Sequence, residues 1–179
     1  ADPLKIISEI CETEKIYKVY WNRVYEPWCI QRDKKIKETL NLKGIETNSF
    51  NGSLLWEPWE VLKNDGTPYR VFTPYYRRGC LNAVGPRIPT KAPQKIQYYE
   101  FQKIKSLDIE SLNLLPTHNW KNKIIKKWNV GEKAAEQRLE EFISFELNGY
   151  KEGRNFPNKK NVSRLSPHLH WGEISPNTI

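Results

Sequence analysis

A proline- and glycine-rich stretch over residues 85–93 divides this chain of 179 residues. Its proline and glycine residues are Gly85, Pro86, Pro89 and Pro93. Proline removes a backbone donor and glycine adds backbone freedom, so neither a helix nor a strand runs well through such a segment. We therefore expect two folded parts, with residues 1–84 in a first domain, residues 85–118 as the connection and residues 119–179 at the start of a second domain.

The first domain alternates helical and extended patterns. Residues 4–10 place apolar side chains at helical spacing, and residues 16–21 form a short apolar and aromatic run typical of a buried strand. A second helical pattern covers residues 28–43, with Gly44 as a left-handed stop, before residues 45–50 turn extended again. Because a strand, a helix and a strand in this order form the crossover of a parallel sheet, the pattern predicts an α/β fold.

An irregular segment and a short helix are expected next. The aromatic residues between positions 51 and 70 are dense but follow no period, which predicts a long structured loop. Thr73-Pro74 combines a capping residue with a first-turn proline, so we expect a short helix over residues 75–82.

The second domain is predicted to be helical. Residues 131–147 have apolar side chains on one helical face, with Glu132 in the first turn, where the helix dipole favours a carboxylate. Residues 150–162 are polar and contain proline and glycine, which predicts a loop. Ser166-Pro167 then begins a further short helix ahead of Gly172.

The chain is basic and rich in aromatic side chains. Its seven Trp, nine Tyr and six Phe argue for a packed rather than a disordered chain. A net charge of +8 fits a polyanionic partner, and the excess of basic residues over positions 120–164 predicts a phosphate-facing surface there. Charge alone leaves open a basic protein with no nucleic-acid role. The basic residues of this region are Lys121, Lys123, Lys126, Lys127, Lys133, Arg138, Lys151, Arg154, Lys159, Lys160 and Arg164.

The cysteines and histidines suggest no metal site. Cys11, Cys29 and Cys80 are odd in number and far apart, which predicts neither a disulfide scaffold nor a zinc site. His168 and His170 lack a neighbouring arrangement of ligands, so we expect structural roles for them. Without an apolar run of roughly 20 residues or a charged-then-apolar leader, the sequence predicts a soluble, unsecreted, cytoplasmic protein with no membrane partner.

Two features predict that the chain is an interior piece of a longer protein. It contains no Met, so the native start is expected to be processed away or to lie upstream. At the other end, Ser175-Pro176 combines a helix cap with a first-turn proline, and the sequence stops at Ile179 before one turn is complete.

The stretch from Asn161 to Leu169 carries two hydroxyl side chains and an arginine directly before a helix start. Backbone amides at a helix N-terminus, hydroxyl donors and an arginine together suit an anion such as a pyrophosphate. A Ser-Pro helix cap beside a solvated arginine explains the same residues, so the residues alone leave both interpretations open.

Several segments resemble DNA photolyases and cryptochromes, in the family's order along nearly the whole chain. Residues 164–176 (RLSPHLHWGEISP) resemble the segment that opens the family's flavin domain. Residues 128–157 are similar to the helix and loop that precede it, and residues 21–27 and 69–76 are similar to the second half of the antenna domain. The resemblance implies the C-terminal part of a Rossmann-like α/β antenna domain, followed by the start of an all-α FAD-binding domain.

The resemblance also implies roles for individual residues. Tyr150 matches a tyrosine that contacts the flavin, and the loop after Asn161 matches the one that binds the FAD phosphates, with two serines as hydroxyl donors. Val162 stands where the family usually has a hydroxyl side chain, so only its backbone would contribute. Arg154 matches a position that meets the DNA backbone. The implied cofactor-binding residues are Tyr150, Val162, Ser163, Arg164, Leu165 and Ser166.

A second, antenna chromophore is less defined. In folate-binding members an Asn-Glu pair follows the Tyr-Glu motif and holds the pterin, whereas Trp28 and Cys29 take those places here. This departure argues against folate, and a deazaflavin antenna or none fits equally well.

The implied activity is light-driven repair of pyrimidine dimers in UV-damaged DNA, by an electron passed from reduced FAD in a monomeric protein. The family's adenine site, the residues near the reactive flavin ring and the tryptophan electron-transfer chain lie beyond Ile179. We therefore expect no catalytic residue within the chain and no activity from this piece alone. Two alternatives stay open: a cryptochrome photoreceptor with the same cofactor, and a non-enzymatic basic module that binds nucleic acid without flavin. Both cyclobutane and (6-4) dimers fit as substrates.

Overall fold

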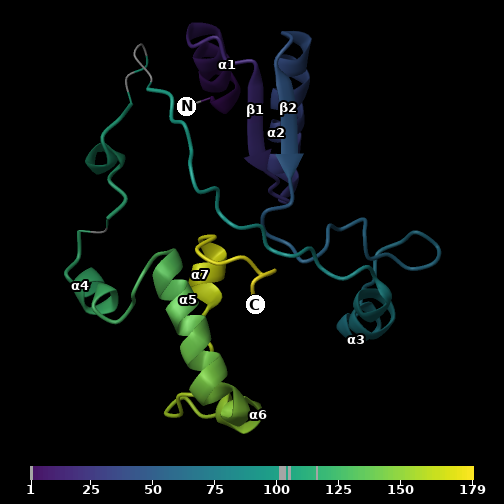
Figure 1. The fold of residues 1–179 in the computed structure, drawn as a ribbon, viewed down its shortest axis with the longest axis vertical. Helices are drawn as coiled ribbons and strands as arrows, with labels where there is room; N and C mark the ends of the chain where they lie inside the picture. Colours follow the sequence, from purple (N-terminus) through teal and green to yellow (C-terminus); the bar gives the residue numbers. More distant parts are fainter. Residues whose placement is uncertain (1, 101–103, 105, 116) are drawn as a thin grey trace. The chain divides into compact units, whose positions relative to one another are not determined.

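The computed structural model describes residues 2–100, 104, 106–115 and 117–179. Contacts group the chain into two compact units, one formed by Ala1–Ser53 with Lys91–Leu114 and the other by Leu54–Thr90 with Leu115–Ile179 (Figure 1). Residues 54–84 thus group with the second unit, although we assigned them to the first domain. The domain boundaries themselves stay a prediction.

The first unit contains the expected strand–helix–strand crossover. Its main elements in chain order are α1 (Pro3–Thr13), β1 (Lys18–Asn22), α2 (Pro27–Leu42) and β2 (Glu46–Phe50) (Figure 1). β1 and β2 pair in parallel, with Lys18 opposite Glu46 and an ion pair of 2.8 Å between their side chains. The prediction of a parallel α/β crossover is confirmed for these elements.

The ends of these elements follow from local hydrogen bonds. Asp2 caps α1 by accepting a hydrogen bond from the Leu4 amide at 3.0 Å. β1 begins two residues later than predicted, because the Ile16 amide still donates to Cys11 O at the end of α1. Gly44 stops α2 as predicted, with a φ of +77° that a side chain would oppose.

The core of this unit joins the two helices to the start of β2. Buried Cys11, Ile36, Leu40 and Ile45 pack together, with partly buried residues of α1 and β1 against them. Leu40 is fully buried, and with the buried Cys29 and Ile36 it anchors α2.

The second unit is built from short helical segments. They are α3 (Phe72–Pro74), η1 (Tyr75–Gly79), η2 (Cys80–Asn82), α4 (Trp120–Ile125), α5 (Glu132–Glu141), η4 (Phe142–Glu146), η5 (Leu147–Gly149), α6 (Tyr150–Gly153) and α7 (Ser166–His170). A 3₁₀ turn, η3 (Ile109–Leu112), belongs to the first unit. The long helix predicted over residues 131–147 is present as α5, η4 and η5, and the short helix at Ser166-Pro167 is present as α7.

Two predictions about this unit are wrong in detail. The helix near Thr73-Pro74 begins at Phe72, because the Tyr75 amide already reaches Val71 O at 3.2 Å, so Thr73 is not the cap. Residues 150–153 form the short helix α6 rather than a loop, with the Arg154 amide bonded to Tyr150 O at 3.1 Å.

We expect Leu40→Ala to lower the local free energy of opening of the first unit by about 2–5 kcal/mol, because it empties a fully buried site. Leu42→Ala, two residues along the same helix, is the control, since Leu42 is 90% exposed and its loss should cost less than about 0.5 kcal/mol. Native-state hydrogen exchange of the β1 and β2 amides in the full-length protein measures both. Equal effects of the two variants would contradict this core.

Candidate cofactor site

The Arg138 side chain of α5 holds the loop that precedes α7. Its Nε donates to Ser163 O at 2.8 Å and its Nη2 donates to Val162 O at 3.2 Å. On the other side of the guanidinium, Nη1 donates to Glu141 Oε2 at 3.1 Å. Nη2 also pairs with Glu146, whose side chain is 15% exposed. All three guanidinium nitrogens therefore have acceptors.

This arrangement orients the backbone amides of the loop. None of the described peptide bonds is cis, and in a trans peptide the N–H points away from the carbonyl oxygen. Because the carbonyls of Val162 and Ser163 face Arg138, the amides of Ser163 and Arg164 point away from it. Within the described part of the chain, none of the amides of residues 163–166 donates a hydrogen bond. These four donors are available to a ligand.

The backbone at Arg164 favours an anion at this place. Arg164 has a φ of +55°, a left-handed conformation that is uncommon outside glycine, and Leu165 follows with a φ of −85° and a ψ of −7°. Adjacent residues of opposite backbone hand turn their amides into one concavity, which binds anions. Leu165 is buried and anchors the loop, whereas the Arg164 and Ser166 side chains are exposed.

Tyr150 begins α6 and Arg154 follows its last residue, and their side chains are in contact. The Tyr150 ring meets the Phe142 ring edge-to-face at a centroid distance of 6.0 Å, and Arg154 Cζ lies 5.5 Å from the Tyr150 ring centroid. Both side chains are exposed, with Tyr150 at 39%. The predicted flavin-contacting and DNA-contacting residues are therefore in contact with each other.

Asn161 joins α6 to the loop. Its Nδ2 donates to Glu146 O at 3.1 Å, and its side chain fills the space beside Gly149 and Gly153. A Cβ on Gly153 would overlap the Cβ of Asn161, so both glycines are needed for this close approach. Tyr150 lies between the two glycines in sequence, so its position is linked to that of the loop.

His168 and Glu173 connect α7 to the start of α5. The buried His168 ring contacts Glu173 Oε2 through Nδ1 at 2.6 Å. The hydrogen bond from His168, and then one from the Gly131 backbone amide, hold the pKa of the Glu173 carboxyl below its usual value. His168 is therefore buried and hydrogen-bonded, which agrees with the structural role expected for it.

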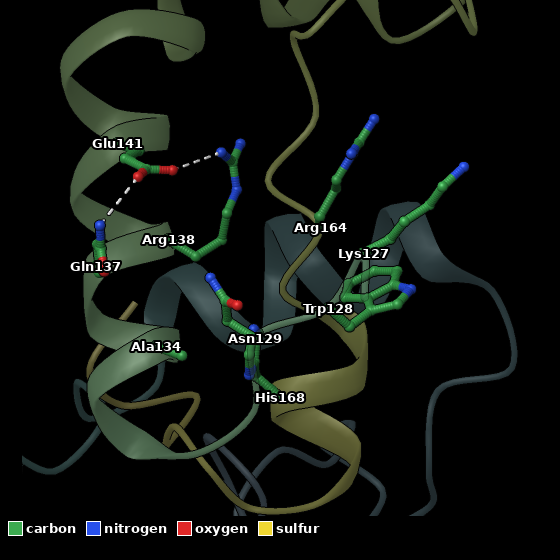
Figure 2. Close-up of a pocket in the computed structure, with 9 residues that line it drawn as sticks. All are labelled: Lys127, Trp128, Asn129, Ala134, Gln137, Arg138, Glu141, Arg164 and His168. Atoms are coloured by element: carbon green, nitrogen blue, oxygen red, sulfur yellow. Dashed lines mark hydrogen bonds and ion pairs between the residues drawn. The ribbon is translucent and has the colours of Figure 1, made fainter. Parts of the chain in front are cut away.

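A cavity of about 150 Å³ lies between α5 and the loop (Figure 2). Of the predicted site residues only Arg164 lines it, together with Lys127, Trp128, Asn129, Ala134, Gln137, Arg138, Glu141 and His168. Drug-sized ligands occupy roughly 300–1,000 Å³, so this cavity does not hold a flavin dinucleotide. It suits a small polar molecule only.

Several residues of this site were missed or misread at the sequence level. The sequence pattern placed Arg138 with the phosphate-facing residues, but its nitrogens donate hydrogen bonds to backbone carbonyls and to carboxylates. The role of Asn161 was not foreseen. Gly149, directly before α6, and Gly153, its last residue, were the available signal for a close approach, because they are four residues apart.

The described residues were also compared with the requirements of a metal site and of a membrane-spanning helix. Among them, no three His, Cys, Asp or Glu side chains gather as a metal site would require. No helix in the described ranges has the length and apolar character needed to cross a membrane.

Comparison with known proteins identifies the family. The sequence profile of the DNA photolyase family matches residues 1–94. The chain is 36% identical over 179 residues to the deoxyribodipyrimidine photo-lyase of Agrobacterium fabrum, covering 99% of this chain and 37% of that protein. It is 29% identical to cryptochrome-1 of Arabidopsis thaliana, covering 97% of this chain and 25% of that protein.

A solved structure supports the same assignment. The crystal structure of a bacterial class III photolyase from Agrobacterium tumefaciens matches with a TM-score of 0.90 at 36% identity, covering 99% of this chain and 36% of that one. The chain belongs to the DNA photolyase and cryptochrome family. It spans little more than a third of the length of these photolyases.

We expect Gly153→Ala to destabilise α6 and the following loop by about 1–3 kcal/mol, because the new Cβ displaces Asn161 and its hydrogen bond to Glu146 O. Gly85→Ala is the control, since a Cβ there meets nothing within 4 Å. Hydrogen exchange of the amides of residues 147–166 in the full-length protein measures the difference. Unchanged exchange in Gly153→Ala would contradict the packing of Asn161.

The lowered pKa of Glu173 predicts a pH dependence. Its stabilising contribution is fully present above the ordinary carboxyl pKa of about 4.3 and is lost as the pH falls through the lower folded-state pKa. Glu173→Gln should therefore melt at a lower temperature than the wild-type full-length protein at pH 7, and this difference should shrink in acid. Melting curves of both proteins between pH 7 and acid test it, and a difference that grows in acid would contradict the pairing.

Proposed function

We propose that the full-length protein containing this chain is a light-driven DNA repair enzyme that splits pyrimidine dimers with reduced FAD. The observation that carries this proposal is the row of four backbone amides at residues 163–166, with a left-handed residue among them and no acceptor within the described part of the chain. The photo-lyase names of similar proteins from Agrobacterium and other bacteria support the same reaction class.

The residues present fit the diphosphate of FAD. A pyrophosphate is an anion with several acceptor oxygens, and the loop offers four amides and the hydroxyls of Ser163 and Ser166. Arg164 adds an exposed cation beside the amides. Val162 has no hydroxyl and serves through its carbonyl, which fixes the Ser163 amide. Tyr150 would contact the flavin from α6.

Reduced FAD, when bound and excited by light, would be the electron donor for the damaged bases. The residues of this chain bind and orient: the loop holds the diphosphate, and Tyr150 limits the position of the flavin. Arg154 would contact a phosphate of the DNA backbone, which sets the position of the duplex without reading its sequence. The damaged bases would leave the stack to reach the cofactor, as is general for enzymes that act on bases. The protein would act as a monomer, in the compartment that holds the DNA.

The proposal restricts which antenna chromophore the protein would bind. Cys29 is buried on α2, and Trp28 is exposed with Arg32 Cζ 5.3 Å from its ring centroid. Neither side chain supplies the amide and carboxylate pair that holds a pterin in folate-binding members. We therefore favour a deazaflavin antenna or none.

A cryptochrome is the second candidate, because the similarity extends to cryptochrome-1 of Arabidopsis thaliana. The same amide row would serve FAD in a photoreceptor, so this site does not separate the two functions. The excess of basic residues over positions 120–164 favours a DNA substrate.

The deciding experiment uses the full-length protein reconstituted with FAD and reduced. We expect blue light to remove dimers from UV-damaged DNA, with a dark sample as the control, and separate substrates with cyclobutane or (6-4) dimers identify the lesion. Flavin binding without dimer loss would favour the cryptochrome. A protein that takes up no flavin under anaerobic reconstitution would overturn both and leave a nucleic-acid-binding module.

A further inference from the structure

We propose that Arg138 is a positioning residue of the FAD diphosphate site, which fixes the amide row from the side opposite to the phosphates. The inference rests on the proposed function, since it takes FAD as the ligand of the loop. It adds a residue that contacts no part of the cofactor and acts only through two peptide groups.

The planar guanidinium of Arg138 binds two peptide groups at once. Nε and Nη2 lie in one plane and reach the carbonyls of two successive residues, Ser163 and Val162, at 2.8 and 3.2 Å. A planar fork fixes the orientation of both peptides, whereas the single ammonium of a lysine gives no such paired geometry. The direction of two amides of the row therefore depends on this side chain.

The charges around Arg138 disfavour an anion on its side of the loop. Glu141 and Glu146 both pair with Arg138, so the three groups together carry a formal charge of −1. A pyrophosphate on this side would meet a surplus carboxylate, and the guanidinium nitrogens already have acceptors. Arg138 is therefore suited to hold the loop from behind and not to contact the phosphates. Its cation lies at the carbonyl end of each peptide dipole, which leaves the donor end for the anion.

The backbone of Arg164, which follows Ser163, is strained. Arg164 has a left-handed φ of +55° without being glycine, and such conformations persist where the surroundings impose them. The two bonds from Arg138 fix the peptides directly before it. Burial of Leu165 fixes the residue directly after it. Arg138 and Leu165 together impose the conformation that gathers the amides of residues 164–166.

The test compares Arg138→Lys and Arg138→Gln in the full-length protein with Lys133→Gln as a matched control. Lys133 is exposed on the same helix, so its loss removes the same charge without touching the loop. Dissociation constants are measured for FAD and for riboflavin, which lacks the phosphates. We expect the FAD constant to rise about tenfold or more in both Arg138 variants, which is about 1.4 kcal/mol per tenfold. The riboflavin constant and the control should stay unchanged.

Hydrogen–deuterium exchange is the second measurement, and it does not depend on enzyme activity. In the wild-type protein, hydrogen–deuterium exchange of residues 163–166 should slow on addition of FAD. In Arg138→Lys the same amides should gain less protection when FAD is added, because two of them are no longer held in one orientation. Glu146→Gln is a milder variant that loosens the guanidinium without removing it, and it replaces an Arg138 variant that fails to fold. It should shift the FAD dissociation constant and the exchange of residues 163–166 in the same direction as the Arg138 variants.

The outcomes separate this proposal from the proposed function. Wild-type protein that binds no FAD would overturn the proposed function. The role of Arg138 alone would be overturned if the wild-type protein binds FAD and the folded Arg138 variants show unchanged FAD affinity and unchanged exchange. An equal loss of FAD and riboflavin would make Arg138 a general structural residue and would also overturn it.

Discussion

The bond network of Arg138 is the interaction on which the candidate site depends. Two of its hydrogen bonds reach loop carbonyls, and hydrogen bonds to a charged group are each worth about 1.5–3 kcal/mol. A residue in a sparsely populated backbone region costs about 1–3 kcal/mol. The pair of bonds therefore outweighs the strain at Arg164, and the loop keeps a conformation that it would not hold alone. Glu141 and Glu146 keep the guanidinium in place.

Two other contacts complete this support. Asn161 packs against Gly149 and Gly153 and so ties α6 to the loop. The His168–Glu173 contact ties α7 to the start of α5. A binding site works best when its backbone is held by surrounding side chains, because less ordering is then needed when the ligand arrives. The loop is held by α5 before it, α6 beside it and α7 after it.

The same support serves either function that the family offers. A photolyase and a cryptochrome both have to hold the diphosphate of FAD, and the diphosphate site proposed above would meet that need in either protein. The distinction depends on whether damaged DNA reaches the cofactor, so Arg154 and the basic residues around it bear on function more directly than the loop does. Contact between Arg154 and Tyr150 brings the predicted DNA-contacting and flavin-contacting residues together at the two ends of α6.

The sequence by itself determined the local elements and the family. Periodicity and the glycine at position 44 were enough for α1 and α2, because these depend on neighbouring residues, and the strand–helix–strand order was enough for the parallel pair, because such a crossover joins parallel strands. The family followed from a long specific string at residues 164–176. Only the tertiary structure decided the role of Arg138, which the sequence grouped with phosphate-facing cations, because its acceptors lie up to 25 residues away in the chain. It also decided that Asn161 fills the space left by two glycines. The glycines hint at a close approach, but which side chain fills the space depends on how segments apart in the sequence pack together.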